Sequence, residues 1–83
     1  MKNEHKLLSQ VVEQSVVRVV GTQCGRGMSA RLASMGLRPG VLLKVLKSAG
    51  PGPLVVAVGH SRLGLGRGIA HKIVVEAEDK QAD

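Results

Sequence analysis

The chain has 83 residues, a net charge of +6 and 43 % hydrophobic residues, and it contains no Phe, Trp or Tyr. A chain of this length builds one domain and buries only about 60 % of its unfolded surface, which excludes a roomy catalytic cleft. Its core must be filled by Val, Leu, Ile, Met and Ala, a composition that favours β-strands.

The first fifteen residues are polar and of mixed charge, with too little apolar bulk for a signal peptide or a membrane span. We expect residues 1–15 to form a flexible N-terminal segment. The β-branched run Val16–Val20 ends at Gly21 and predicts the first strand. Cys24 is the single cysteine, so no intramolecular disulfide can form, and a free thiol suits a reducing cytoplasm.

A helix is predicted over residues 26–35, because apolar residues recur there at i, i+4 and i+7. These residues are Met28, Leu32 and Met35. We expect this stripe to pack on the core, and the alternative is a groove for a partner. Gly36 is typical of a residue that ends a helix.

The next segment predicts two strands and two turns. Pro39 and Gly40 favour a chain reversal, after which residues 41–47 predict a strand with one buried face. Residues 49–53 hold two glycines and two prolines and cannot continue that strand. Residues 54–58 predict the third strand.

The C-terminal part alternates between apolar and other residues. Residues 61–65 predict a fourth strand, residues 66–72 have room for one helical turn, and residues 73–77 predict a closing strand. Residues 78–83 are expected to be a disordered tail, which leaves 16–77 as the domain. The predicted fold is mostly β: a small, closed SH3-like barrel of about five strands, with one helix after the first strand and a short helix before the last.

The charge is unevenly distributed. Between Val16 and Val75 the chain has nine basic residues and no acidic one. A uniformly positive body speeds association with an anionic partner, whether a protein, a nucleic acid or a lipid surface. The basic residues are Arg18, Arg26, Arg31, Arg38, Lys44, Lys47, Arg62, Arg67 and Lys72.

Two segments resemble the FeoA family. Arg31-Leu-Ala-Ser-Met-Gly-Leu-Arg-Pro-Gly-Val41 resembles its helix end, Met-Gly-Leu-x-Pro-Gly turn and strand. The segment from Val58 to Val75 resembles the last hairpin, short helix and final strand of the family. The chain has Gly66 and Ile69 at positions where the family usually carries a basic and often an acidic residue.

The resemblance implies an SH3-like barrel and a cytoplasmic accessory role beside FeoB, the membrane iron transporter with a cytosolic GTPase domain. It also implies kinship with the SH3-like domain of iron-dependent repressors. We expect the partner to contact the basic, leucine-bearing positions of the turn and the last hairpin, where apolar area lies inside a charged rim. These positions are Leu37, Arg38, Arg62, Leu63, Leu65 and Arg67. The alternative is that these leucines fill the barrel while the charges are solvated.

Enzymatic chemistry and a built cofactor site are not expected. No carboxylate of the body can orient a His or complete a metal site, and Cys24, His60 and His71 lack ligand spacing. The pattern Gly-x-Gly-x-x-Ala at residues 25–30 lacks the following strand and acidic residue of a dinucleotide site. We therefore expect no catalytic residue, metal or cofactor.

Nucleic-acid binding, or a role as an adaptor of an iron-dependent transcription regulator, is the alternative function. The basic body is suited to phosphates. Small barrels that bind single strands stack bases on aromatic rings, each worth about 1 to 3 kcal/mol, and this chain has none. Nucleic acid is thus the less favoured partner, and the sequence leaves the oligomeric state open.

Overall fold

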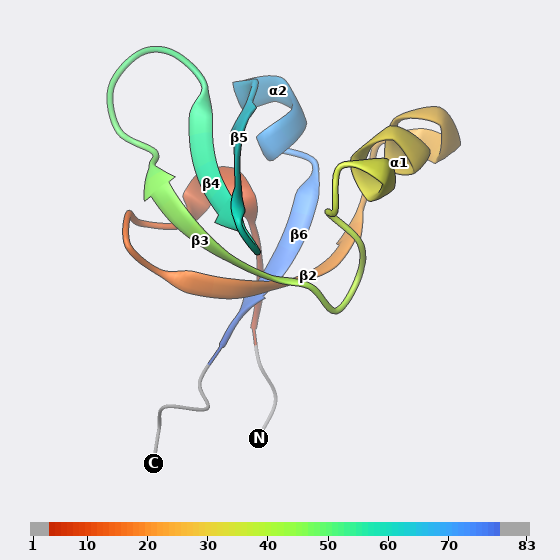
Figure 1. The fold of residues 1–83 in the computed structure, drawn as a ribbon, viewed down its shortest axis with the longest axis horizontal. Coiled ribbons are helices and arrows are strands. Elements are labelled where there is room, and N and C mark those ends of the chain that lie inside the picture. Colours follow the sequence, from red (N-terminus) through yellow and green to blue (C-terminus); the bar gives the residue numbers. More distant parts are fainter. Residues whose placement is uncertain (1–3, 79–83) are drawn as a thin grey trace.

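The computed structural model describes residues 4–78, which form a strongly curved sheet with helix α1 projecting from one side (Figure 1). No helix in this range is long and apolar enough to cross a membrane. The elements in chain order are β1 (His5–Leu7), the 3₁₀ helix η1 (Leu8–Gln10), β2 (Val16–Thr22), α1 (Gly25–Ser34), β3 (Leu42–Lys47), β4 (Leu54–Val58), β5 (Ser61–Leu65), α2 (Arg67–Ala70) and β6 (Ile73–Ala77).

The sheet has six strands in the order β1-β6-β2-β3-β4-β5, and all neighbours are antiparallel. The mostly β fold is confirmed, with one strand more than the five expected. Register shifts on β2, between Val19 and Gly21, and on β3, between Val45 and Lys47, bend the sheet as bulges do. Within residues 4–78, however, β1 and β5 do not pair with each other, so the curved sheet keeps two edges.

The core is aliphatic and lies inside the curve of the sheet. Alternation along the strands places every second side chain inward: Val17 and Val19 of β2 are buried, whereas Val16 and Arg18 are not. The core side chains are Leu8, Val11, Val17, Val19, Leu32, Leu37, Leu43, Val45, Leu54, Val56, Leu65, Ala70, Ile73 and Val75.

The N-terminal segment belongs to the fold, contrary to the expectation that the domain begins at Val16. Strand β1 pairs with β6, and Leu8 and Val11 are buried in the core. Polar contacts hold the same segment: His5 Nε2 lies 3.6 Å from Glu76 Oε1, and the Ser9 hydroxyl lies 3.2 Å from His71 Nδ1. The order of these polar residues therefore comes from pairing with a strand almost seventy positions away in the chain, which a local pattern does not encode.

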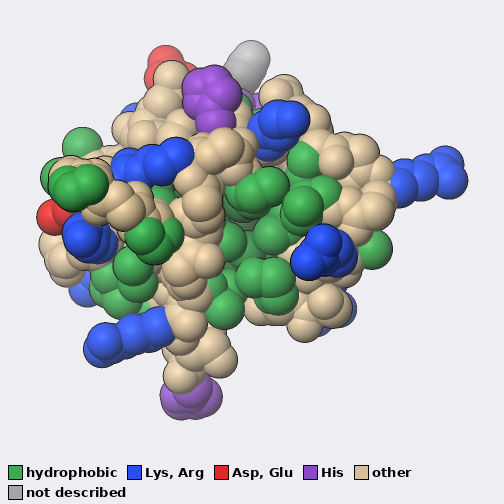
Figure 2. All heavy atoms as spheres, turned by 90° about the horizontal axis from the view of Figure 1, so that it is seen from above, with side chains coloured by type: hydrophobic (Ala, Val, Ile, Leu, Met, Phe, Trp, Pro, Cys, Tyr) green, Lys and Arg blue, Asp and Glu red, His purple; other side chains and the backbone are tan. Residues whose placement is uncertain are grey.

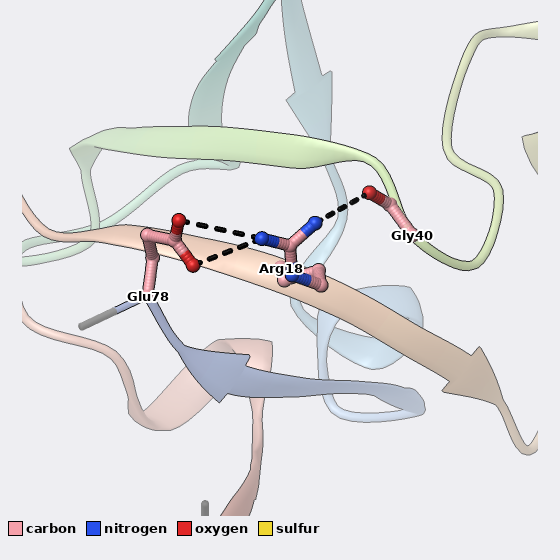
Figure 3. Close-up of polar contacts among 3 residues, drawn as sticks. All are labelled: Arg18, Gly40 and Glu78. Atoms are coloured by element: carbon pink, nitrogen blue, oxygen red, sulfur yellow. Dashed lines mark hydrogen bonds and ion pairs between the residues drawn. The ribbon is translucent and has the colours of Figure 1, made fainter. Parts of the chain in front are cut away.

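Arg18 on the outer face of β2 links Glu78, the residue after β6, to the turn before β3 (Figure 3). Its Nη2 donates to both carboxylate oxygens of Glu78, at 3.0 and 3.3 Å, and its Nη1 donates to the carbonyl of Gly40 at 3.1 Å. Glu78, assigned to the tail from the sequence, is thus packed against the sheet. The rest of the expected tail, residues 79–83, lies outside the described residues.

Glu13 holds the loop between β3 and β4. Its carboxylate accepts hydrogen bonds from the backbone N–H of Ser48, at 2.8 Å, and of Ala49, at 3.0 Å. The hydrogen bond from Ala49, followed by that from Ser48, lowers the pKa of Glu13 below its ordinary value of 4.5. The ionised side chain therefore stabilises the loop.

Replacement of Glu13 by Gln is expected to lower the free energy of unfolding at pH 7. A carboxyl group whose pKa is lowered by folding stabilises the fold above its unfolded pKa, and this contribution is lost as the pH falls through the folded pKa. The gap between wild type and Glu13→Gln should therefore shrink as the pH falls below 4.5. Guanidinium unfolding followed by far-UV circular dichroism measures the free energy of unfolding of both proteins. A difference between them that does not change with pH would contradict this role of Glu13.

Candidate partner-binding site

Helix α1 is attached to the sheet at a few points and leaves part of its apolar stripe uncovered. The Thr22 hydroxyl, at the end of β2, lies 2.5 Å from the Ser29 hydroxyl on the helix. Leu32 is buried, Met28 is half-buried against the core, and Met35 is 41 % exposed. The expected packing of this stripe on the core is therefore confirmed for Leu32, whereas Met28 is only partly buried and Met35 is exposed.

The end of α1 explains the position of Leu37. Gly36 has a φ of +96°, and the N–H groups of Gly36 and Leu37 donate to the carbonyls of Ala33, at 3.0 Å, and Leu32, at 2.9 Å. This is a Schellman motif, in which the residue after the glycine packs against the last turn of the helix. Leu37 is consequently only 2 % exposed and is part of the core rather than a surface contact.

Five half-buried apolar side chains pack against the buried core, and we call this set the apolar hollow. One comes from the residue just before α1, and the others come from α1, β4, β5 and α2. Figure 2 shows apolar side chains gathered in a hollow between α1 and the end of the sheet that carries β5 and α2. The residues of the apolar hollow are Cys24, Met28, Val58, Leu63 and Ile69.

Three carboxylates of the fold contact other parts of the molecule. Glu76 is beside His5, Glu78 is beside Arg18, and Glu13 binds the loop between β3 and β4. Lys and Arg side chains lie around the hollow in Figure 2, while the acidic side chains visible there lie away from it. Apolar area inside a positive rim is the arrangement of an interface for an acidic partner.

The structure separates the six positions predicted to bind a partner. Leu65 is 3 % exposed and, like Leu37, fills the core. Leu63 is half-buried in the apolar hollow, and Arg38 and Arg62 are exposed. The predicted set is therefore not one surface, because two of its leucines are inside the barrel.

Arg67, the sixth position, binds carbonyl groups of the loop between β3 and β4. The guanidinium donates to three backbone carbonyls: Nη1 to Ser48 at 2.7 Å, Nη2 to Gly50 at 2.8 Å and Nε to Gly52 at 3.0 Å. A loop rich in Gly and Pro has few side chains of its own to order it. Arg67 therefore has a structural task in addition to its charge.

The candidate metal ligands are dispersed. Within residues 4–78 no three His, Cys, Asp or Glu side chains are grouped as a metal site would require. Cys24 is half-buried with its sulfur 4.0 Å from the Ser29 hydroxyl, His71 contacts Ser9, and His60 is exposed in the turn between β4 and β5. These three side chains therefore lie in different parts of the fold.

The sequence contained partial signals for this site. The helical period of Met28 indicated an apolar face, and the alternation that places Leu63 and Leu65 on one face of β5 also predicted that both point inward. Val58 and Ile69 were not predicted as site residues. They lie on β4 and α2 and pack against the core beside residues from other elements, and this depends on the tertiary arrangement.

Comparison with known proteins identifies relatives of the whole domain. A family model described as the FeoA domain matches residues 6–77, which include β1 and run to the end of β6. The chain is also 38 % identical over 64 residues to "Putative Fe(2+) transport protein A" of Methanocaldococcus jannaschii, with 77 % of this chain and 74 % of that protein covered.

Solved structures give the same result. The crystal structure of an iron uptake regulatory protein, FeoA, has a TM-score of 0.82 and 32 % identity, and the match covers 90 % of this chain and 100 % of that one. FeoA of Stenotrophomonas maltophilia, a prokaryotic SH3 domain protein crystallised with zinc, has a TM-score of 0.74 and 25 % identity over 84 % of this chain and 88 % of that one. The expected SH3-like fold and the resemblance to FeoA are confirmed.

The role of Arg67 is tested by substitution. Arg67→Ala and Arg67→Lys are each expected to lower the free energy of unfolding by about 1 to 2 kcal/mol. Alanine removes all three donors, and the single ammonium nitrogen of lysine cannot take the positions of three guanidinium nitrogens. The matched control is Arg62→Ala, which removes an exposed arginine and should change stability by less than about 0.5 kcal/mol. Equal effects of Arg67→Ala and Arg62→Ala in guanidinium unfolding would refute the structural role.

Proposed function

Because the chain belongs to the FeoA family of Fe²⁺ transport accessory proteins, we propose that it binds and modulates the cytosolic GTPase region of the FeoB iron transporter. The protein acts in the cytoplasm and performs no chemistry of its own. The observation that carries this proposal is the apolar hollow, whose half-buried side chains pack against the core, together with the Lys and Arg side chains that Figure 2 shows around the hollowed surface. A protein partner can cover the hollow and neutralise the rim at the same time.

The composition of the hollow supports a protein as the partner. Met28 is flexible and polarisable, and methionines of this kind adapt to the shape of a bound surface. Leu63 and Val58 supply branched apolar area that is already half removed from water. Burying what remains exposed stabilises a complex in proportion to the apolar area covered.

Modulation follows from linkage. If the hollow binds one conformation of the GTPase region more tightly than another, binding shifts the population toward that conformation. The shift equals the difference between the two binding free energies, so no catalytic group is needed on this chain. The dispersed Cys24, His60 and His71 are compatible with such a passive role.

The proposed function is tested by titration of this protein against the isolated FeoB GTPase domain and, separately, against duplex DNA and RNA at physiological salt. Saturable binding to the GTPase domain without binding to nucleic acid is expected. Calorimetry is suitable, because the chain has no Trp or Tyr for fluorescence. Saturable binding to nucleic acid with no binding to the GTPase domain would reject the proposal in favour of the alternative function.

A pair of variants tests the site itself. Met28→Glu places a charge in the apolar hollow and is expected to weaken binding to the GTPase domain at least tenfold, as substitutions at the centre of an interface do. Val12→Glu makes the same change in charge at a side chain that is 70 % exposed outside the hollow, and should leave the affinity within about twofold. Circular dichroism checks that both variants fold. Equal affinities of the two variants would exclude the hollow as the site.

A further inference from the structure

Strand β5 is a free edge of the sheet. It pairs with β4, and within the described residues no other strand lies on its opposite side. An exposed strand edge presents N–H and C=O groups that can pair with another chain. The second edge, β1, has three residues against the five of β5 and contributes no side chain to the apolar hollow.

The hairpin geometry identifies the free groups on β5. Gly59 and His60 form a two-residue turn, and Val58 pairs with Ser61. In such a hairpin the closing pair exchanges both hydrogen bonds and the pairs then alternate, so Ser61, Leu63 and Leu65 bond to β4. The backbone groups of Arg62 and Gly64 point to the free edge. Among the described residues they form no hydrogen bond in any loop, turn or cap.

The free edge and the apolar hollow adjoin each other, because Leu63 lies on β5 between Arg62 and Gly64 and its side chain is part of the hollow. A strand added to β5 would direct every second side chain toward the hollow and the others toward solvent. The usual SH3 mode, in which a proline-rich helix binds an aromatic-lined groove, is not available to a chain without Phe, Trp or Tyr. Addition of a strand needs only backbone groups and apolar pockets, and this surface offers both.

We propose that an extended segment of the partner, with apolar residues alternating with acidic ones, adds to β5 as a seventh strand of the sheet. This inference rests on the proposed function and specifies how the GTPase region is recognised. The acidic residues follow from the charge of the site: Arg62 is exposed on β5, and the carboxylates of Glu13, Glu76 and Glu78 contact other elements. A second copy of this chain is disfavoured, because antiparallel pairing of two β5 strands brings two Arg62 side chains near each other.

Amide hydrogen exchange tests the inference residue by residue. In the free protein, the amides of Arg62 and Gly64 should exchange fast, whereas those of Leu63 and Leu65 should be protected by β4. With saturating FeoB GTPase domain, the Arg62 and Gly64 amides should gain at least tenfold protection. A parallel titration uses the synthetic peptide Glu-Val-Glu-Leu-Glu-Val-Glu, with the N-methylated peptide as its control.

A matched pair of substitutions tests the same contact by affinity. Arg62→Ala removes the charge and keeps the N–H, so it should weaken binding about two- to threefold. Arg62→Pro also removes the N–H that points to the partner, and should weaken binding by about a further tenfold. Proline is tolerated on an edge strand where the N–H faces solvent, and circular dichroism verifies the fold. Equal affinities of the two variants would overturn the inference.

The outcomes separate this inference from the proposed function. Binding of the GTPase domain without protection of Arg62 and Gly64 overturns strand addition and leaves the proposed function standing. Protection by the peptide alone, with no binding of the GTPase domain, supports strand addition and rejects the proposed partner. If the GTPase domain does not bind and the peptide gives no protection, both the proposed function and strand addition are rejected. Protection that grows with protein concentration before any partner is added shows pairing between copies and overturns the partner segment as the occupant.

Discussion

The open side of the sheet is the constraint on which the rest of the structure depends. A chain of 83 residues without aromatic side chains has only aliphatic volume with which to fill a curved sheet. Within the described residues the sheet ends at β5 instead of closing on β1, and α1 is attached by a hydroxyl contact and the burial of Leu32. The missing pairing leaves β5 with a free edge. The half-buried side chains of the apolar hollow pack against the core from α1 and from the β4, β5 and α2 region.

Charged side chains connect loops and strand ends of this small fold through hydrogen bonds and an ion pair. Arg18 joins Glu78 to the turn before β3. In the loop between β3 and β4, Glu13 binds N–H groups and Arg67 binds C=O groups. These contacts lie on parts of the fold other than the hollow. Arg62 and Arg38, in contrast, are exposed, so the positive field on that side is not locally neutralised. Arg18 and Arg67 thus have structural partners, whereas Arg38 and Arg62 carry exposed charges.

Most of the fold followed from the sequence where local patterns decide it. The strands at 54–58 and 61–65 have the predicted bounds, because Pro53, Gly59 and Gly66 delimit them. The strand at 73–77 also has its predicted bounds, which the alternation of apolar residues indicated. Strand β1 was missed, since its polar residues become ordered only by pairing with β6. For Leu37 the sequence left partner contact and barrel filling open, and its burial agrees with the second, as the helix C-cap signal Met-Gly-Leu favours. The structural role of Arg67 could not be predicted, because the carbonyl groups that it binds lie in a loop that is distant in the sequence.

The recognition of a backbone edge has a consequence for modulation. Affinity in strand addition comes mainly from hydrogen bonds of the partner's main chain, which are available only when that segment is extended and unpaired. A segment that is folded away in one state of a GTPase region and extended in another would bind this chain in the second state alone. The ratio of the two affinities then sets how far the equilibrium moves, and a ratio of about 10⁴ would switch it almost completely. Control of this kind selects a conformation of the partner, so it requires no reaction at the strand edge itself.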